Sequence, residues 1–82
     1  MTGYEPVFNE TALRALLIEK RSERIRILAL INNLAENPRP ADFLEQSARG
    51  REVDVFVCEE WMITVWRDHA VKELRVVNIE RV

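Results

Sequence analysis

The sequence predicts a single α+β domain over residues 1–82, with a short N-terminal strand and a two-helix hairpin packed on one face of an antiparallel sheet of three to four strands. Three observations predict this fold class. Apolar residues recur at helical spacing in the first half of the chain, and from Arg51 onward they recur at every second position. The length of 82 residues suits one domain with a small core.

The first elements are a strand and a helix. Residues 4–8 are apolar but contain Pro6, which has no N–H to donate to a strand ladder, so this stretch is predicted as an edge strand. Asn9 is a favourable N-cap, and Glu10 in the first turn suits the helix dipole. A first helix is therefore predicted over Glu10–Lys20.

The second helix has the clearest helical pattern in the chain. Ser22 is its expected N-cap, and its apolar stripe consists of Ile27, Leu30, Ile31 and Leu34. Pro38 and Pro40 end it, because proline cannot donate an N–H and disfavours helical geometry in the residue before it. Residues 20–24 carry no core residue and suit a bend, which favours a hairpin over one continuous helix.

The second half predicts a strand meander. Residues 41–50 form a polar connector, in which one helical turn around Phe43 and Leu44 is an option. Residues 51–58, 61–66 and 71–82 alternate as strands, with turns at 59–60 and 67–70. The third strand is expected to turn Leu74, Val76 and Asn78 to one face and Arg75, Val77, Ile79 and Arg81 to the other.

The faces of the first two strands follow from the same alternation. The residues expected to face the helices are Val53, Val55, Trp61, Ile63 and Val65, and those expected on the open face are Phe56, Cys58, Met62, Thr64 and Trp66. Both faces contain large apolar residues, so the assignment can also be inverted, and Phe56 and Trp66 are then core.

Composition excludes several classes of protein. The net charge is -2 with a pI near 5.4, whereas non-specific nucleic-acid binding usually needs a basic excess. One Cys and one His allow neither an internal disulfide nor a zinc cluster, so no metal and no cofactor are predicted. No signal peptide or membrane span is recognised, which predicts a cytoplasmic protein without a membrane partner.

Two stretches carry a family resemblance over nearly the whole chain. The run Leu-Ala-Glu-Asn-Pro-Arg-Pro at 34–40 and the strand Trp-Met-Ile-Thr-Val-Trp at 61–66 lie in the expected order between two helices and a meander. In this, the sequence resembles the RelE/ParE superfamily of toxins from bacterial type II toxin-antitoxin modules. The resemblance implies a toxin-like protein neutralised by a cognate antitoxin, which either cuts messenger RNA on the ribosome or inhibits DNA gyrase.

The sequence departs from the nuclease pattern of that superfamily. RelE-like nucleases carry basic residues on the exposed sheet face, where they polarise the scissile phosphate and stabilise the leaving oxygen. This chain has Asp54, Phe56 and Met62 at the corresponding positions. Arg81 matches a basic residue of the last strand, but the sequence ends at Val82 without the Tyr-bearing tail. A degenerate or absent nuclease activity is therefore expected.

Four residues are candidates for an atypical catalytic site. Arg49 and Arg51 flank Gly50, where they can hold a phosphate or simply blunt a strand end as solvated charges. His69 can act as an acid or base, or be an ordinary turn residue beside Asp68. With Arg81 these residues define the third hypothesis, an active ribosome-dependent mRNA endonuclease.

The candidate partner-binding residues are Phe56, Met62 and Trp66, because an exposed aromatic cluster on a small domain more often marks a protein interface than a catalytic centre. They support a second hypothesis, a non-toxic interaction module that forms a homodimer or binds a regulatory partner. Lys20, Arg21, Arg24 and Arg26 form the densest basic cluster, but Glu19 and Glu23 interleave with it, which favours ordinary intrahelical pairing over an acidic partner.

Overall fold

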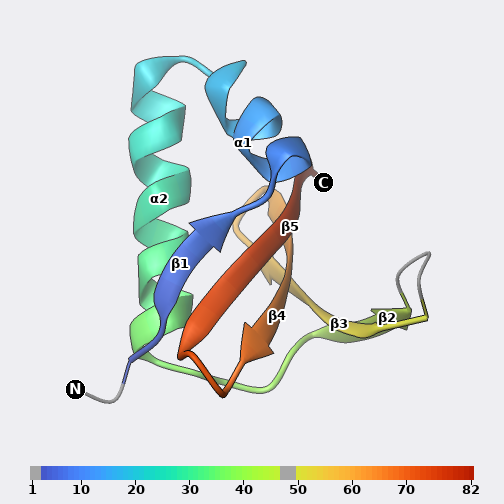
Figure 1. The fold of residues 1–82 in the computed structure, drawn as a ribbon. Coiled ribbons are helices and arrows are strands. Elements are labelled where there is room, and N and C mark those ends of the chain that lie inside the picture. Colours follow the sequence, from blue (N-terminus) through green and yellow to red (C-terminus); the bar gives the residue numbers. More distant parts are fainter. Residues whose placement is uncertain (1–2, 47–49) are drawn as a thin grey trace.

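The computed structural model of the chain describes residues 3–46 and 50–82, so the candidate Arg49 lies outside the described residues. Within these ranges the chain forms two helices and five strands (Figure 1). In chain order they are β1 (Glu5–Phe8), α1 (Glu10–Leu17), α2 (Arg21–Glu36), β2 (Phe43–Gln46), β3 (Glu52–Cys58), β4 (Trp61–Asp68) and β5 (Glu73–Arg81). The predicted α+β class is confirmed.

The sheet has the strand order β1-β5-β4-β3-β2. Strand β1 pairs with β5 in parallel, and the other neighbours are antiparallel, so the sheet is mixed and has one strand more than predicted. The additional strand is β2, and the helical turn considered around Phe43 and Leu44 is wrong. Pairing with β3 overrides the weak local signal of this short segment.

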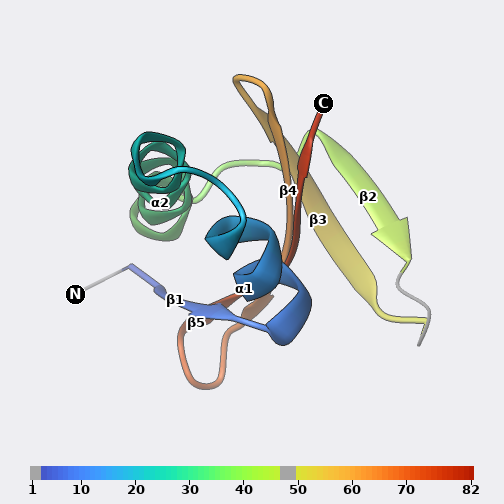
Figure 2. The ribbon, with the colours of Figure 1, turned by 90° about the horizontal axis from the view of Figure 1, so that it is seen from above.

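The helices begin and end close to the predicted positions. The side chain of Asn9 caps α1 by accepting a hydrogen bond of 2.8 Å from the backbone N–H of Ala12. Helix α1 ends at Leu17 rather than Lys20, and α2 begins at Arg21 with Lys20 as its N-cap instead of Ser22. Both helices lie on one side of the sheet, as Figure 2 shows, and the predicted hairpin is confirmed.

The core lies between this hairpin and the covered face of the sheet, which we call the helix face; the other is the open face. Thirteen buried residues form its cluster: Ala12, Leu16, Ile27, Ile31, Leu34, Ala35, Phe56, Trp61, Ile63, Val65, Leu74, Val76 and Ile79. Burial of apolar area of this kind is the main favourable term in folding.

The structure corrects the predicted face of β3. Phe56 is opposite Ile63 in the register, and antiparallel partners share a face, so Phe56 lies in the core with an exposed fraction of 0%. Val55 is opposite Thr64 on the open face. The prediction paired the two strands out of phase by one residue, which moves every side chain of a strand to the other face. Met62 and Trp66 lie on the open face as predicted, both partly buried.

A bulge corrects the predicted faces of β5. Val65 is opposite Val76 while Thr64 is opposite Asn78, which leaves Val77 as an extra residue. The alternation therefore shifts by one position at Val77. Val76 and Ile79 both lie on the helix face, whereas the sequence pattern predicts them on different faces. Strand β4 also continues through Arg67 and Asp68, which were expected in a turn; the turn spans 69–72.

Candidate functional site

Strands β3 and β4 part at one end of the sheet and leave a notch between them. Their pairing ends at Asp54 opposite Val65, although β4 continues along β5 as far as Asp68. Figure 1 shows the β2–β3 hairpin turning away from β4 beyond this point. The notch has a volume of about 340 Å³ and is lined by Arg51, Glu52, Asp54, Trp66, Arg67, Asp68 and His69.

Arg67 and Asp54 form an ion pair across the notch. Arg67 Nη1 lies 3.1 Å from Asp54 Oδ2, and the side chain of Arg67 is only 14% exposed. The guanidinium also lies over the ring of Phe56, 5.6 Å from its centroid. Nε and Nη2 of Arg67 are buried without a hydrogen-bond partner, so the carboxylate of Asp54 is the main compensation for this charge.

Trp66 presents its ring on the open face beside two arginines. The guanidinium carbon of Arg51 lies 4.0 Å from the ring centroid and that of Arg75 lies 5.1 Å from it. Arg75 is also paired with Asp68 and Glu73, at 3.7 and 3.0 Å. The stack joins β5 to the start of β3 across the notch, and cation–π contacts of this kind contribute about 0.5–1 kcal/mol at exposed sites.

His69 closes the notch at the end of β4. Its Nδ1 lies 2.5 Å from the hydroxyl oxygen of Tyr4, which donates the hydrogen bond when Nδ1 is unprotonated, and the two rings meet edge to face. Tyr4 in turn donates its backbone N–H to the carbonyl of Ala35 at the end of α2. His69 therefore links the β4–β5 turn to the start of β1.

Arg81 lies at the opposite end of β4. It is opposite Trp61 in the register, and its guanidinium lies over that ring at 4.3 Å. Two carboxylates hold it, Glu60 at 2.7 Å and Glu19 at 3.3 Å. Because His69 follows Trp61 by eight positions on an extended strand, about 26 Å of backbone separates the two ends.

The four candidate catalytic residues are thus divided by the fold. Arg51 and His69 line the same notch, Arg81 lies at the far end of the strand, and Arg49 is outside the described residues. Phosphate chemistry needs cations placed where charge develops. In the notch, Arg67 is compensated by Asp54, and the neighbouring Arg75 by Asp68 and Glu73.

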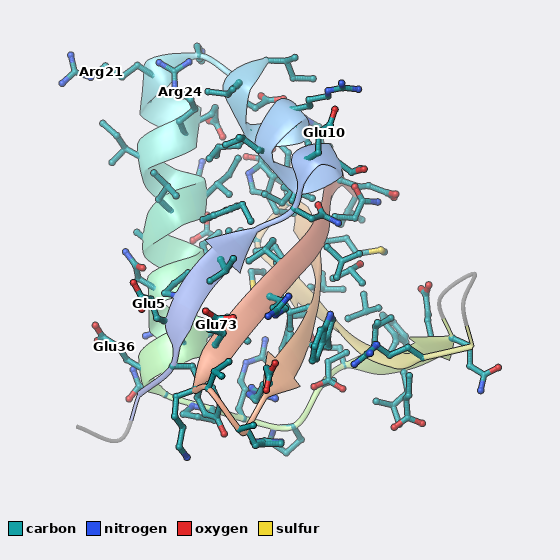
Figure 3. The ribbon with its side chains drawn as sticks, in the orientation of Figure 1. Glu5, Glu10, Arg21, Arg24, Glu36 and Glu73 are labelled. Carbon is teal, nitrogen blue, oxygen red and sulfur yellow. The ribbon has the colours of Figure 1, made fainter. Side chains whose placement is uncertain are left out.

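The basic cluster of the helices lies apart from the notch. Figure 3 shows Arg21 and Arg24 at the start of α2, while Glu36 lies at its other end near Glu5 and Glu73. Arg24 donates a hydrogen bond of 2.6 Å to the backbone carbonyl of Glu19, just beyond the end of α1. This contact satisfies a carbonyl beyond the end of the helix and fixes the bend of the hairpin.

A carboxylate fixes the segment that leads from α2 to β2. Asp42 Oδ2 accepts a hydrogen bond of 2.7 Å from the backbone N–H of Val57, which lowers the pKa of Asp42, and Arg39 at 3.4 Å lowers that pKa further. Arg39 also lies over the ring of Phe56. Burial raises the pKa of the Cys58 thiol, so this thiol is not activated.

The sequence pattern does not predict two features of this region, the position of Arg67 and strand β2. Arg67 was placed in a turn, although the alternation of Ile63 and Val65 continues through it and places it on the helix face. Strand β2 gave no signal, because four residues are too few to show a period.

Comparisons with known proteins give matches in structure only. No family model and no curated protein matches the sequence. A chain of the RelBE2 toxin–antitoxin complex from Mycobacterium tuberculosis superposes with a TM-score of 0.80 at 11% identity, over 99% of this chain and 100% of that one. The archaeal RelE–RelB complex from Pyrococcus horikoshii gives 0.72 at 11% identity, over 98% and 96%. The intact E. coli RelBE complex gives 0.71 at 15% identity, over 96% and 96%.

The chain is therefore a small α+β domain in which a helical hairpin covers one face of a mixed sheet. Its fold is that of the RelE toxins, as the resemblance implied. Neither helix of the described chain is long and apolar enough to span a membrane.

Proposed function

We propose that this chain is the toxin-like component of a type II toxin-antitoxin pair, neutralised by a cognate antitoxin, with a degenerate or absent nuclease activity. The observation that carries the proposal is the full-length likeness to chains from toxin–antitoxin complexes, with a TM-score of up to 0.80 over 99% of the residues. Because one fold hosts many unrelated functions, the proposal also depends on the charges of the site.

The charges of the notch support the second half of the proposal. The resemblance implies a cation on the open face at the position of Asp54, but the register places Asp54 on the helix face, where its carboxylate is engaged with Arg67 beside the notch. A carboxylate at this point repels a phosphate and neutralises the nearest guanidinium. The proposal therefore places the activity in binding a target rather than in cutting RNA.

The test is expression of the chain alone and together with the product of the adjacent reading frame. We expect growth arrest on expression alone, relief on co-expression, and a stable complex of the two proteins. Unimpaired growth with abundant, folded protein would contradict the toxin-like role. Two assays then distinguish the known targets of such toxins: cleavage of messenger RNA in a translating extract, and inhibition of DNA supercoiling by gyrase. Cleavage of messenger RNA that is lost in Arg81→Ala would support the nuclease hypothesis.

A second candidate function is a non-toxic interaction module, and the exposed parts of Met62 and Trp66 on the open face favour it. It predicts self-association that weakens in Trp66→Ala, measured by sedimentation over a range of concentrations. A monomer at all concentrations would argue against it.

A further inference from the structure

The two edges of the sheet differ in what covers them. Strand β1 contains Pro6, which has no N–H to donate, and α2 packs beside it, with a hydrogen bond of 2.9 Å from the Tyr4 N–H to the Ala35 carbonyl. Strand β2 ends the strand order, and no strand of the described chain pairs with its outer side. Figure 2 shows β2 at the end of the sheet farthest from α2. Within residues 3–46 and 50–82, the outer side of β2 is therefore open, whereas that of β1 is covered.

Strand β2 exposes an apolar side chain on each face. Phe43 is 55% exposed on the open face beside Val55, and Leu44 is 63% exposed on the helix face beside Asp54. All four residues of the strand are exposed. Edge strands are usually protected by proline, charge, short length or a cover. Strand β2 has no proline and one charge, Glu45, and its exposed apolar side chains can pair with those of another chain.

The same hairpin carries carboxylates without ion partners. Neither Glu45 on β2 nor Glu52 on β3 forms an ion pair with any of residues 3–46 and 50–82. Asp42 and Asp54, which lie on the same two strands or just before them, are both paired. Among the described residues, Glu45 is therefore the charge of the edge strand β2, and it has no ion partner there.

We propose that β2 is the docking edge for an extended, basic segment of the partner, which adds to the sheet as a sixth strand. In an antiparallel addition the segment reads polar, basic, apolar, apolar, so that its basic residue lies opposite Glu45 and its apolar residues opposite Leu44 and Phe43. Backbone hydrogen bonds supply the affinity and these side chains the register. The inference rests on the proposed function only for the identity of the partner, the antitoxin.

A second copy of this chain fits the edge less well. Residues that face each other in an antiparallel pair lie on the same side of the sheet, so Glu45 of one copy would meet Phe43 or Glu45 of the other. Either arrangement leaves the Glu45 carboxylate without a cation. In the second, the two Glu45 carboxylates would face and repel each other. The partner segment therefore differs from β2 itself.

The first test uses short synthetic peptides and needs no knowledge of the antitoxin. A capped peptide with the core Thr-Lys-Val-Val is compared with one containing Thr-Glu-Val-Val, by titration of the amide resonances of the isotopically labelled protein. We expect the lysine peptide to shift the β2 resonances and to bind about two to five times more tightly. The variant Glu45→Lys is expected to reverse this preference, and Glu36→Lys, an exposed change on α2, to retain it.

Two results of that titration would overturn the inference. They are shifts confined to residues outside the β2–β3 hairpin, and an unchanged preference in Glu45→Lys.

The second test uses the complex with the product of the adjacent reading frame. We expect the β2 amides to exchange with solvent at least about tenfold more slowly in the complex than in the free protein. We also expect Leu44→Glu to raise the dissociation constant of the complex at least about tenfold, because a charge replaces an apolar contact in the register. The matched control Ile18→Glu changes a residue that is 81% exposed between the helices and should have no effect.

The outcomes separate the two proposals. A complex that is indifferent to Leu44→Glu and leaves β2 exchange unchanged overturns the docking edge, while the proposed function stands. Failure of any complex to form, together with the peptide preference at Glu45, supports the edge and contradicts the proposed antitoxin.

Discussion

The two tryptophans of β4 have similar contacts and different surroundings. Trp61 lies on the helix face with an exposed fraction of 2%, and Arg81 stacks on it at 4.3 Å. Trp66 lies on the open face, where Arg51 stacks on it at 4.0 Å. The same residue pair thus occurs at both ends of one strand. What separates them is the helical hairpin, which covers the first and leaves the second accessible.

The charges around the two rings also differ in what they connect. At Trp61, Arg81 joins the end of β5 to the β3–β4 turn through Glu60 and to the end of α1 through Glu19. At Trp66, the ion pairs join adjacent strands around a notch that remains open. The Trp61 end therefore holds the fold together, and the Trp66 end has the free surface that binding requires.

The largest expected effect tests this contrast directly. Trp61→Ala should lower the free energy of unfolding by about 3–5 kcal/mol, because a buried ring leaves a cavity. Trp66→Ala should lower it by about 1–2 kcal/mol, because this ring is only partly buried and loses less apolar contact. Urea denaturation followed by circular dichroism measures both. Equal losses would mean that the open face is as well covered as the helix face.

The helices and the fold class were predictable because they depend on local signals. Asn9 and the prolines at 38 and 40 bound the hairpin in sequence as they do in the structure. The parallel pairing of β1 with β5 was not predictable in the same way, since it joins residues at opposite ends of the chain.

The notch could not be predicted because it depends on register. The predicted face of Phe56 is wrong because the register of β3 and β4 differs by one residue from the expected one. The predicted face of Ile79 is wrong because of the bulge at Val77. Neither the shift nor the bulge has a signature in a strand where both faces are apolar. The open position of Trp66 was nevertheless predicted, because its alternation with Val65 is independent of the partner strand.

The second prediction concerns the ion pair in the notch. Asp54→Ala should destabilise the protein by about 1–3 kcal/mol, because it leaves the mostly buried guanidinium of Arg67 without its carboxylate. Adding Arg67→Met should recover part of the loss, because the uncompensated charge is then gone. Chemical denaturation of the single and double variants measures the coupling. A double variant less stable than Asp54→Ala would contradict this account.

The third prediction is a smaller effect at the Trp61 end. The groups around Arg81 are partly exposed, so Glu60→Ala and Arg81→Ala should show a coupling of less than about 1 kcal/mol in a double-mutant cycle. The coupling should shrink as salt rises, because exposed charges are screened. A coupling of zero would mean that Arg81 acts through its stacking on Trp61 and not through Glu60.

The smallest effect concerns the segment that positions β2. The pKa of Asp42 is lowered in the folded protein, first by the Val57 N–H and then by Arg39, so the ionised carboxylate stabilises the fold. That contribution is fully present above the ordinary pKa of an unfolded aspartate, about 3.9, and is lost as the pH falls through the lower value of the folded state. Asp42→Asn keeps an acceptor for Val57 but does not titrate.

The difference in stability between the natural protein and Asp42→Asn should therefore decrease between pH 6 and pH 3, as about one protonation step. Urea midpoints at several pH values measure it, with Glu36→Gln as an exposed control. A constant difference would show that the Val57 contact does not depend on the charge of Asp42. In that case the segment before β2 is held by its backbone and by Arg39 on Phe56, and acid would leave the docking edge in place.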